Sequence, residues 1–225
     1  MCGRYTIYDE ATDLEYLSEY FGLQKVAVDK IPARYNASPS QSLPVIFENH
    51  RTGDRILNAF RWGLIPSWAK DINIGYKMIN ARSESLSEKT SYKGPFKHQR
   101  CLIPASGFYE WDKTKEKMPH YFKLKDSPIM SFAGLYERWK SPNGDIWSYT
   151  IITTDANDLV AKTHPRMPAI IHPKEFDFWL DPDNQNTEEL SGFLKPYPAN
   201  EFETWTVSRE LNKPVNDYKG LLERV

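Results

Sequence analysis

Short extended runs separated by turn residues are the feature that most limits how this chain can fold. Residues 42–48 and 55–62 alternate between apolar and polar side chains on either side of a Thr-Gly-Asp turn at residues 52–54, which predicts a β-hairpin. A Pro-Asn-Gly-Asp sequence at residues 142–145 predicts another hairpin turn. Further strands are expected at residues 100–103, 107–112, 119–125, 129–137, 146–153 and 203–207.

Helices are expected at the periphery of these strands. Apolar positions recur at helical spacing over residues 9–21, and Gly22 can end that helix. An extended segment is expected at residues 76–80. Shorter helices are expected at residues 82–89, 155–161, 174–180 and 187–194. Runs of strands with peripheral helices define an α+β fold with a mainly antiparallel sheet. No repeat or linker interrupts residues 1–225, so we expect one compact domain.

The charge balance limits the partners of the chain. It has 29 Lys and Arg against 30 Asp and Glu, a net charge of −1. This total excludes binding of a polyanion through bulk charge alone, but it leaves open a local basic groove. The N-terminus lacks the apolar segment of a secretory signal, and no stretch of about 18 apolar residues occurs. We therefore expect a cytoplasmic protein that does not contact membranes.

The two cysteines have different surroundings. Cys101 lies between Arg100 and the apolar Leu102, and we expect it to be a buried core residue. Removal of Met1 would give Cys2 an α-amine next to its thiol. Such a 1,2-aminothiol condenses with an aldehyde to an imine, and the thiol then closes a five-membered thiazolidine. The alternative is that Cys2 is inert, because many proteins begin Met-Cys by chance.

No metal or cofactor is expected. Two cysteines without nearby histidines do not make a zinc site. The histidines outside the motif at residues 164–168 also lack metal-ligand spacing; they are His50, His98, His120 and His172.

Two segments combine rigid and aromatic residues. Trp62 and Trp68 flank a Gly-Leu-Ile-Pro-Ser sequence, and they can either pack in the core or stack on nucleic-acid bases. Base stacking is worth roughly 1–3 kcal/mol per base. Asn36 and Pro39 fall in a second segment, which is also typical of an ordinary loop that enters a strand.

Asn80 and Arg82 lie in an Asn-Ala-Arg-Ser-Glu sequence. In a pocket, Asn80 can orient a nucleophile and the planar guanidinium of Arg82 can hold a phosphate. The alternative is that Arg82 and Glu84 form a surface ion pair of little energetic value.

Glu110 and His164 are candidates for proton transfer. Glu110 lies between Tyr109 and Trp111 on an apolar strand, which favours a raised pKa and proton transfer near neutral pH. The alternative places Glu110 on the outward face of a half-buried strand. His164 precedes a proline that holds it in an extended or turn conformation, so its ring can be aimed. The alternative for His164 is an ordinary loop position.

Together these motifs occur in the order seen in one family. They are the Met-Cys-Gly-Arg-Tyr start and the sequences at residues 62–68, 80–84, 104–111 and 164–168. The chain resembles the SOS-response-associated peptidase family, also called abasic-site processing proteins. A weaker match at residues 207–216 extends the resemblance nearly to the end of the chain. The resemblance implies a compact α+β domain with a β-barrel-like sheet and a basic DNA channel.

The resemblance also implies an activity in the DNA damage response. Members bind single-stranded DNA and its junctions with duplex DNA, and they cross-link to abasic sites through the N-terminal cysteine as a thiazolidine. The cysteine-peptidase classification came from removal of Met1, which is thought to be autocatalytic. A Schiff-base intermediate permits abasic-lyase chemistry as a side reaction. We expect a monomer without a cofactor that can work beside the replication machinery.

Each motif residue gains an implied role from the resemblance. Cys2 is similar to the nucleophile, and Asn80 to the residue that fixes the cysteine or the open sugar. Glu110 resembles the general acid/base, and His164 the group that handles the proton on the sugar hydroxyl. The implied DNA contacts are Arg4, Pro39, Trp62, Trp68, Arg82, Thr153 and Arg166, with Thr153 placed by spacing alone. Further arginines lie in or beside the motif segments; they are Arg34, Arg61 and Arg100.

Two other function classes remain open from the sequence. One is a cysteine peptidase or N-terminal-nucleophile hydrolase that uses Cys2, His164 and Asn80 on peptides. The other is a non-catalytic single-strand DNA-binding module, for which salt-sensitive binding without a covalent product is expected.

Overall fold

A closed ring of strands forms the centre of the protein. The computed structural model describes residues 2–141 and 144–225. The ring contains β4 (Ser42–Glu48), β5 (Arg55–Trp62), β7 (Arg100–Ala105), β10 (Met130–Trp139) and β11 (Ile146–Asp155). Neighbouring strands pair antiparallel in the order β5-β4-β7-β10-β11, and a short parallel pairing of β11 with β5 closes the ring.

Short strands extend the ring at its edges. Both β6 (Asn80–Arg82) and β12 (Arg166–Pro168) pair with β11, the former parallel and the latter antiparallel. On the other side, β2 (Lys25–Val26) pairs parallel with β5. The strand β11 is therefore the point at which the barrel meets the segments that carry two of the sequence motifs.

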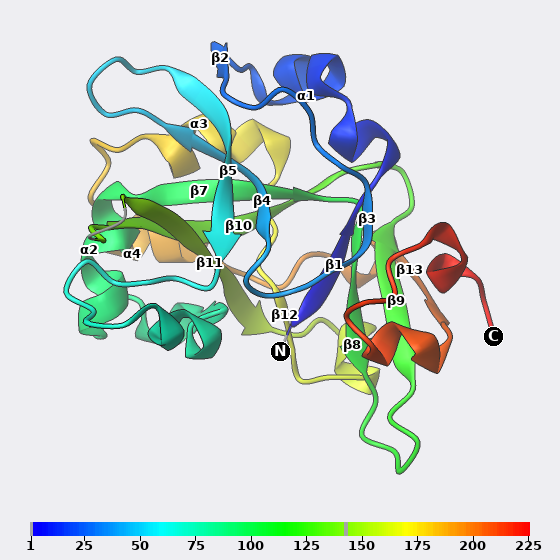
Figure 1. Ribbon diagram of the computed structural model, residues 1–225. Helices are drawn as coiled ribbons and strands as arrows, with labels where there is room; N and C mark the ends of the chain where they lie inside the picture. Colours follow the sequence, from blue (N-terminus) through cyan, green and yellow to red (C-terminus); the bar gives the residue numbers. More distant parts are fainter. Residues whose placement is uncertain (1, 142–143) are drawn as a thin grey trace.

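A second sheet packs beside the ring. Its order is β13-β9-β8-β1-β3, and all of its pairings are antiparallel. Its strands are β1 (Arg4–Ile7), β3 (Arg34–Ala37), β8 (Gly107–Trp111), β9 (Pro119–Leu124) and β13 (Phe202–Thr206). Figure 1 shows β1, in dark blue, on the side of this sheet that faces the ring. The chain therefore begins at the junction of the two sheets.

The helices are short and lie around the outside of the strands (Figure 1). They are α1 (Leu14–Phe21), α2 (Thr90–His98), α3 (Phe176–Leu180) and α4 (Thr187–Gly192). The Asp13 carboxylate accepts hydrogen bonds from the backbone N–H groups of Glu15 and Tyr16 in the first turn of α1. Gly22 ends this helix in the left-handed region at φ 62°. None of the helices in the described residues is long and apolar enough to cross a membrane.

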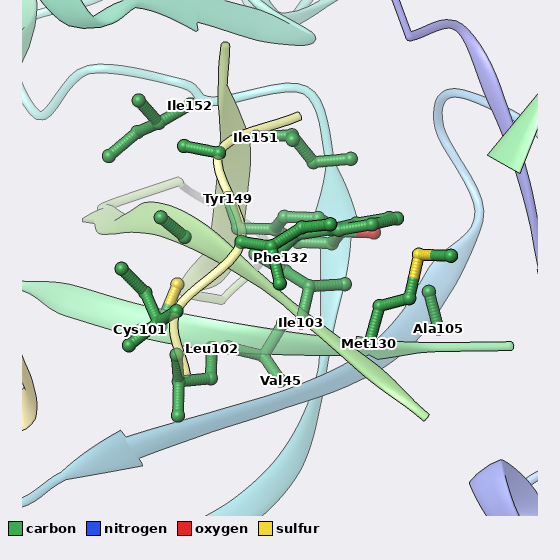
Figure 2. Close-up of a cluster of buried hydrophobic side chains, with 14 of the residues drawn as sticks. Val45, Cys101, Leu102, Ile103, Ala105, Met130, Phe132, Tyr149, Ile151 and Ile152 are labelled. Atoms are coloured by element: carbon green, nitrogen blue, oxygen red, sulfur yellow. The ribbon is translucent and has the colours of Figure 1, made fainter. Parts of the chain in front are cut away.

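Buried apolar side chains fill the interior of the ring. Phe132 and Tyr149 lie across it, with Val45 and Ile103 beside them (Figure 2). The buried hydroxyl of Tyr5 on β1 hydrogen-bonds that of Tyr149 at 2.7 Å, which ties the second sheet to the ring. The sequence prediction that Cys101 is a buried core residue is confirmed.

The predicted fold class and strands are confirmed. The hairpin of β4 and β5 has the predicted bounds, and the later strands begin and end within two residues of the predictions. The helices predicted at 174–180 and 187–194 are also present, as α3 after a 3-10 turn and as α4. For the turn predicted at 142–145, Pro142 and Asn143 lie outside the described residues.

Other local predictions were wrong. The helix predicted over 9–21 is divided at Asp13, which has extended dihedral angles so that it can cap α1. In the segment predicted to be extended at 76–80, Tyr76 and Lys77 end a 3-10 helix that begins at Ile72, and only Asn80 lies in a strand, as the first residue of β6. The helices predicted at 82–89 and 155–161 are reduced to the 3-10 turns Ser83–Ser85 and Val160–Lys162.

A glycine in the ring provides a test of its packing. A Cβ at Gly134 would lie 2.3 Å from Ile103 Cδ1 and 2.9 Å from Thr150 O, so Gly134→Ala overpacks the barrel. We expect it to lower the free energy of unfolding by about 1–3 kcal/mol in urea denaturation. Gly94→Ala in α2 is the matched control, because it meets open space and should stabilise by about 0.5–1 kcal/mol. Equal effects of both variants would contradict this description.

Candidate active site

The start of β1 fixes the position of Cys2. The strand pairs with β8 on one side and β3 on the other, and Cys2 lies two residues before the first residue of the strand, Arg4. The Cys2 carbonyl accepts a hydrogen bond from Asn80 Nδ2 at 2.8 Å, and the Cys2 side chain is fully buried. Asn80 itself begins β6, opposite Ile151 of β11. The Asn80 amide therefore joins the N-terminal segment to the barrel.

Glu110 on β8 is a buried carboxyl group beside this cysteine. Its residue is 2% exposed, so the alternative of an outward-facing position is wrong. Burial raises the pKa of Glu110 to about 7. Burial also raises the pKa of the Cys2 thiol, and the negative charge of Glu110 raises it further. At neutral pH, Cys2 is therefore a thiol next to a carboxyl group that can gain or lose a proton.

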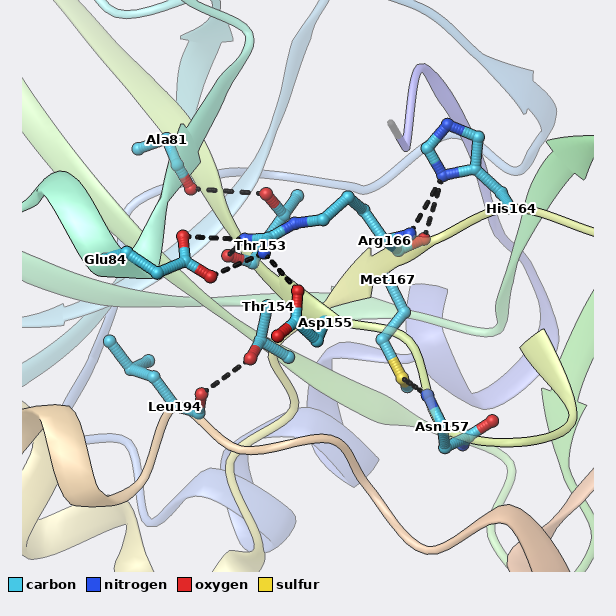
Figure 3. A network of polar contacts seen from close by, with 10 residues as sticks. All are labelled: Ala81, Glu84, Thr153, Thr154, Asp155, Asn157, His164, Arg166, Met167 and Leu194. Atoms are coloured by element: carbon cyan, nitrogen blue, oxygen red, sulfur yellow. Dashed lines mark hydrogen bonds and ion pairs between the residues drawn. The ribbon is translucent and has the colours of Figure 1, made fainter. Parts of the chain in front are cut away.

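His164 approaches the same carboxyl group from the segment before β12. Its Nδ1 lies 3.8 Å from Glu110 Oε1. The same nitrogen accepts a hydrogen bond from the Arg166 backbone N–H at 3.1 Å, which orients the ring (Figure 3). Burial lowers the pKa of His164, so the imidazole is mostly neutral at pH 7. The structure thus brings together the four residues that the sequence analysis assigned to chemistry.

Arg166 is held inside the protein. Its guanidinium pairs with both carboxylate oxygens of Glu84, contacts Asp155 Oδ1 at 2.7 Å and donates to Thr153 O at 2.6 Å. Figure 3 shows these groups closing around the Arg166 side chain, which is 12% exposed. A contact between Arg166 and DNA would have to share or break these bonds. Arg166 joins β12, β11 and the turn that follows β6, and this supports the segment that carries His164.

The remaining predicted DNA contacts differ in accessibility. Arg82 is exposed, and its guanidinium has no hydrogen bond or ion pair to the described part of the chain. Arg4 donates to Asn36 Oδ1 at 2.8 Å and to Leu211 O at 3.0 Å. Thr153 is buried, and its hydroxyl donates to Ala81 O at 3.5 Å. Among these residues, Arg82 is the cation best placed to meet a phosphate.

The two tryptophans have separate roles. Trp62 is 1% exposed, its indole donates to Ile79 O at 2.9 Å, and its ring lies 5.0 Å from that of Tyr5. This corrects the prediction that Trp62 contacts bases, because its faces are covered by the core. Trp68 is 56% exposed, so its ring is available for stacking. Pro39 is partly exposed in the turn after β3.

Two polar residues from the motif segments are structural. Arg100 is buried and donates to carbonyl oxygens of α2 and of the end of α3, so it is not part of the candidate site. The Asn36 amide donates to the carbonyls of Leu211, Lys213 and Asn216, which holds the C-terminal segment on β3. The local sequence predicts a loop position for Asn36, because its partners lie too far along the chain to be recognised by spacing. Within the described ranges, no cluster of three or more His, Cys, Asp or Glu could hold a metal.

Comparison with known proteins agrees with the geometry. The family described as SOS response associated peptidase (SRAP) matches residues 1–214. The chain belongs to this family. It is 43% identical to the abasic site processing protein YoqW of Bacillus subtilis strain 168 over 227 residues, which cover 99% of each chain. It is 35% identical to the abasic site processing protein HMCES of Xenopus tropicalis, over 75% of this chain and 59% of that protein.

A solved structure supports the fold. A crystal structure of a protein from Bacteroides thetaiotaomicron superposes with a TM-score of 0.85 at 28% identity, covering 98% of this chain and 99% of that one. The SRAP fold therefore extends over nearly the whole chain.

The buried carboxyl group predicts a pH-dependent stability. In the unfolded chain the pKa of a glutamate is about 4.3. In the folded protein the pKa of Glu110 is about 7, so the carboxyl group keeps its proton up to that pH. The wild type therefore loses stability as pH rises through this window. Glu110→Gln lacks this loss, so its stability relative to wild type should be greater at pH 8 than at pH 5 by about 1–3 kcal/mol in urea denaturation.

Glu116→Gln is the control, because Glu116 is an exposed glutamate between β8 and β9. It should give the same small difference from wild type at both pH values. A Glu110→Gln difference that does not change between pH 5 and pH 8 would contradict the raised pKa.

Proposed function

We propose that this SRAP protein captures abasic sites in single-stranded DNA as a covalent adduct of Cys2. The observation that carries the proposal is the convergence of Cys2, Asn80, Glu110 and His164 from separate segments of the chain. These groups supply an anchored aminothiol and two proton carriers. Met1 lies outside the described residues, and its removal is part of the proposal.

The proposed reaction begins with the sugar. An abasic deoxyribose exists mainly as a closed hemiacetal, and its opening to the aldehyde requires proton movements that Glu110 and His164 can carry. The Cys2 α-amine then attacks C1′, one water leaves, and an imine forms. The thiol adds to the imine carbon while its proton passes to the nitrogen, which closes the thiazolidine. The product equals protein plus DNA minus one water.

The raised pKa of the Cys2 thiol supports this order of steps. A thiol that stays protonated is a weak nucleophile, whereas an α-amine with a pKa near 8 is partly unprotonated at neutral pH. The amine therefore attacks first, and the thiol reacts after the imine has formed. Asn80 holds the Cys2 carbonyl throughout, which fixes the direction of the amine.

The surface residues support binding of a DNA strand. Arg82 offers an exposed guanidinium for a backbone phosphate, and the exposed ring of Trp68 offers a stacking surface for a base. Arg4 and Pro39 complete the proposed DNA path. A junction between single-stranded and duplex DNA fits the same path, with Trp68 and Pro39 against the last stacked base.

The alternative functions have less support. A cysteine peptidase needs a thiolate, but burial and Glu110 both raise the pKa of the Cys2 thiol. A module that only binds DNA has no use for a buried carboxyl group beside a terminal cysteine. Removal of Met1 by the protein itself and abasic-lyase cleavage through the imine are proposed as accompanying activities.

The exposed Arg82 and the enclosed Arg166 should respond differently to substitution. Arg82→Met should weaken binding to single-stranded DNA and lower the salt dependence of binding by about 0.7 in log–log slope, because one phosphate contact is lost. Its stability should change by less than about 0.5 kcal/mol. Arg166→Met should lower the free energy of unfolding by about 1 kcal/mol, since it leaves the buried Thr153 carbonyl without its donor, whereas the exposed carboxylates of Glu84 and Asp155 are solvated by water. Fluorescence anisotropy measures DNA binding of both variants, and urea denaturation measures their stability. A loss of stability with Arg82→Met and a loss of salt-dependent binding with Arg166→Met would contradict the structure.

Cys2→Ala tests the nucleophile. The variant should form no heat-stable adduct with an abasic oligonucleotide on a denaturing gel, and its affinity for intact single-stranded DNA should change less than about twofold, because the buried Cys2 side chain adds no charge or exposed surface for binding a strand that lacks an aldehyde. Glu110→Gln keeps Cys2 and should form the same adduct more slowly. Cys101→Ala is the matched control, because Cys101 is also a buried cysteine but lies in the core. A stable adduct with Cys2→Ala would exclude the proposed nucleophile.

A further inference from the structure

A groove unrelated to the candidate site lies beside α3 and α4. It has a volume of about 780 Å³ and continues into a narrower recess of about 180 Å³. The two spaces share Ile170, His172, Tyr197 and Glu201, so they form one continuous depression. None of the residues assigned to the reaction or to DNA lines it.

The recess is polar at its inner end. Ser131 is 2% exposed, and among the described residues the Tyr20 hydroxyl is the group that engages its hydroxyl oxygen. Burial raises the pKa of the Tyr20 hydroxyl, and the Ser127 and Ser131 hydroxyls oppose this shift, so the three hydroxyls lie close together. The exposed residues Asp126 and Glu201 also line the recess, and the Tyr197 hydroxyl hydrogen-bonds the Glu201 carboxylate there. A hydroxyl oxygen has two acceptor lone pairs, so Ser131 still has room to accept a hydrogen bond from a donor in the recess.

The outer groove has an apolar floor and an acidic rim. Phe178 is 36% exposed, and its ring lies 4.8 Å from that of Phe193. The acidic residues that line the groove are Glu175, Glu189 and Glu201. Among the lining residues, Lys195 is the lysine that opposes their charge. The groove therefore combines an exposed aromatic surface with an excess of negative charge.

We propose that this depression binds an extended segment of a partner protein, with one lysine side chain in the recess and apolar neighbours on Phe178 and Phe193. A lysine ammonium donates three hydrogen bonds, and the Ser131 hydroxyl together with the Asp126 and Glu201 carboxylates provides acceptors for them. The lysine stem packs along the apolar wall that Ile170 and Tyr197 form. The acidic rim favours a basic segment over an acidic one.

Fluorescence anisotropy with labelled pentapeptide pools tests the proposal. The pools have lysine, glutamate or leucine at the centre and the same mixed residues at the other positions. The lysine pool should bind at least tenfold tighter than the other two. The double variant Asp126→Asn with Glu201→Gln should weaken its binding at least fivefold and leave the amount and rate of adduct formation with abasic DNA unchanged.

The matched control is Glu88→Gln with Glu116→Gln, which removes the same charge from exposed positions outside the groove. It should leave binding of the lysine pool unchanged. Equal affinity for the three pools, or an equal loss in both double variants, would overturn the proposal. Displacement of the lysine pool by spermidine at equal concentration would assign the recess to a free polyamine and would also overturn it. Because DNA adduct formation is measured separately, failure of the proposed DNA chemistry does not affect this result.

Discussion

The hydrogen bond from Asn80 to the Cys2 carbonyl is the contact on which the candidate site depends. Chain ends usually fray unless a strand or another element holds them. Here β1 is held on both sides by β3 and β8, and Tyr5 is bonded to Tyr149 inside the ring. Asn80 adds a contact from β6, which the barrel positions through β11. Cys2 is thus buried and held by its backbone carbonyl, next to a carboxyl group of the second sheet.

Burial gives this site its chemistry and also lowers its stability. A carboxyl group with a pKa near 7 exchanges protons readily at neutral pH. Because this group ionises above about pH 4.5 in the unfolded chain but stays protonated in the folded protein, the free energy of unfolding falls as the pH rises above that value. The thiol is kept protonated by the same environment. Arg166 supports this part of the site, because its bonds to Glu84, Asp155 and Thr153 hold the segment that carries His164. Reactive and supporting groups therefore occupy neighbouring positions in one short motif.

The sequence predicts the long strands and the residue types of the site, because both depend on local pattern. The hairpin of β4 and β5 follows from alternation over seven and eight residues around a turn. By contrast, β1, β3 and β12 have four residues or fewer and are stabilised by partners far along the chain, so their pattern alone is too short to identify them. The helix α2 was missed because Gly94 and Pro95 lower its helix propensity.

Residue roles divide in the same way. The sequence identifies Glu110 and His164 as candidates because their immediate neighbours shape their environment. It does not distinguish Arg82, which faces solvent, from Arg166 and Arg100, whose partners come from distant segments. The same limit applies to Trp62, which a local motif places beside Trp68 but which the fold buries against Tyr5. Order of motifs therefore predicts the family, whereas contacts decide which motif residues meet a ligand.

The most direct test of the proposed capture reaction is the intact mass of the protein after incubation with an abasic single-stranded oligonucleotide. The proposal predicts one species whose mass equals the chain without Met1 plus the oligonucleotide minus one water. The same mass should persist after denaturation and should be absent with an oligonucleotide that lacks the abasic site. A covalent species that retains Met1, or the absence of any covalent species from a chain that begins at Cys2, would contradict the proposal.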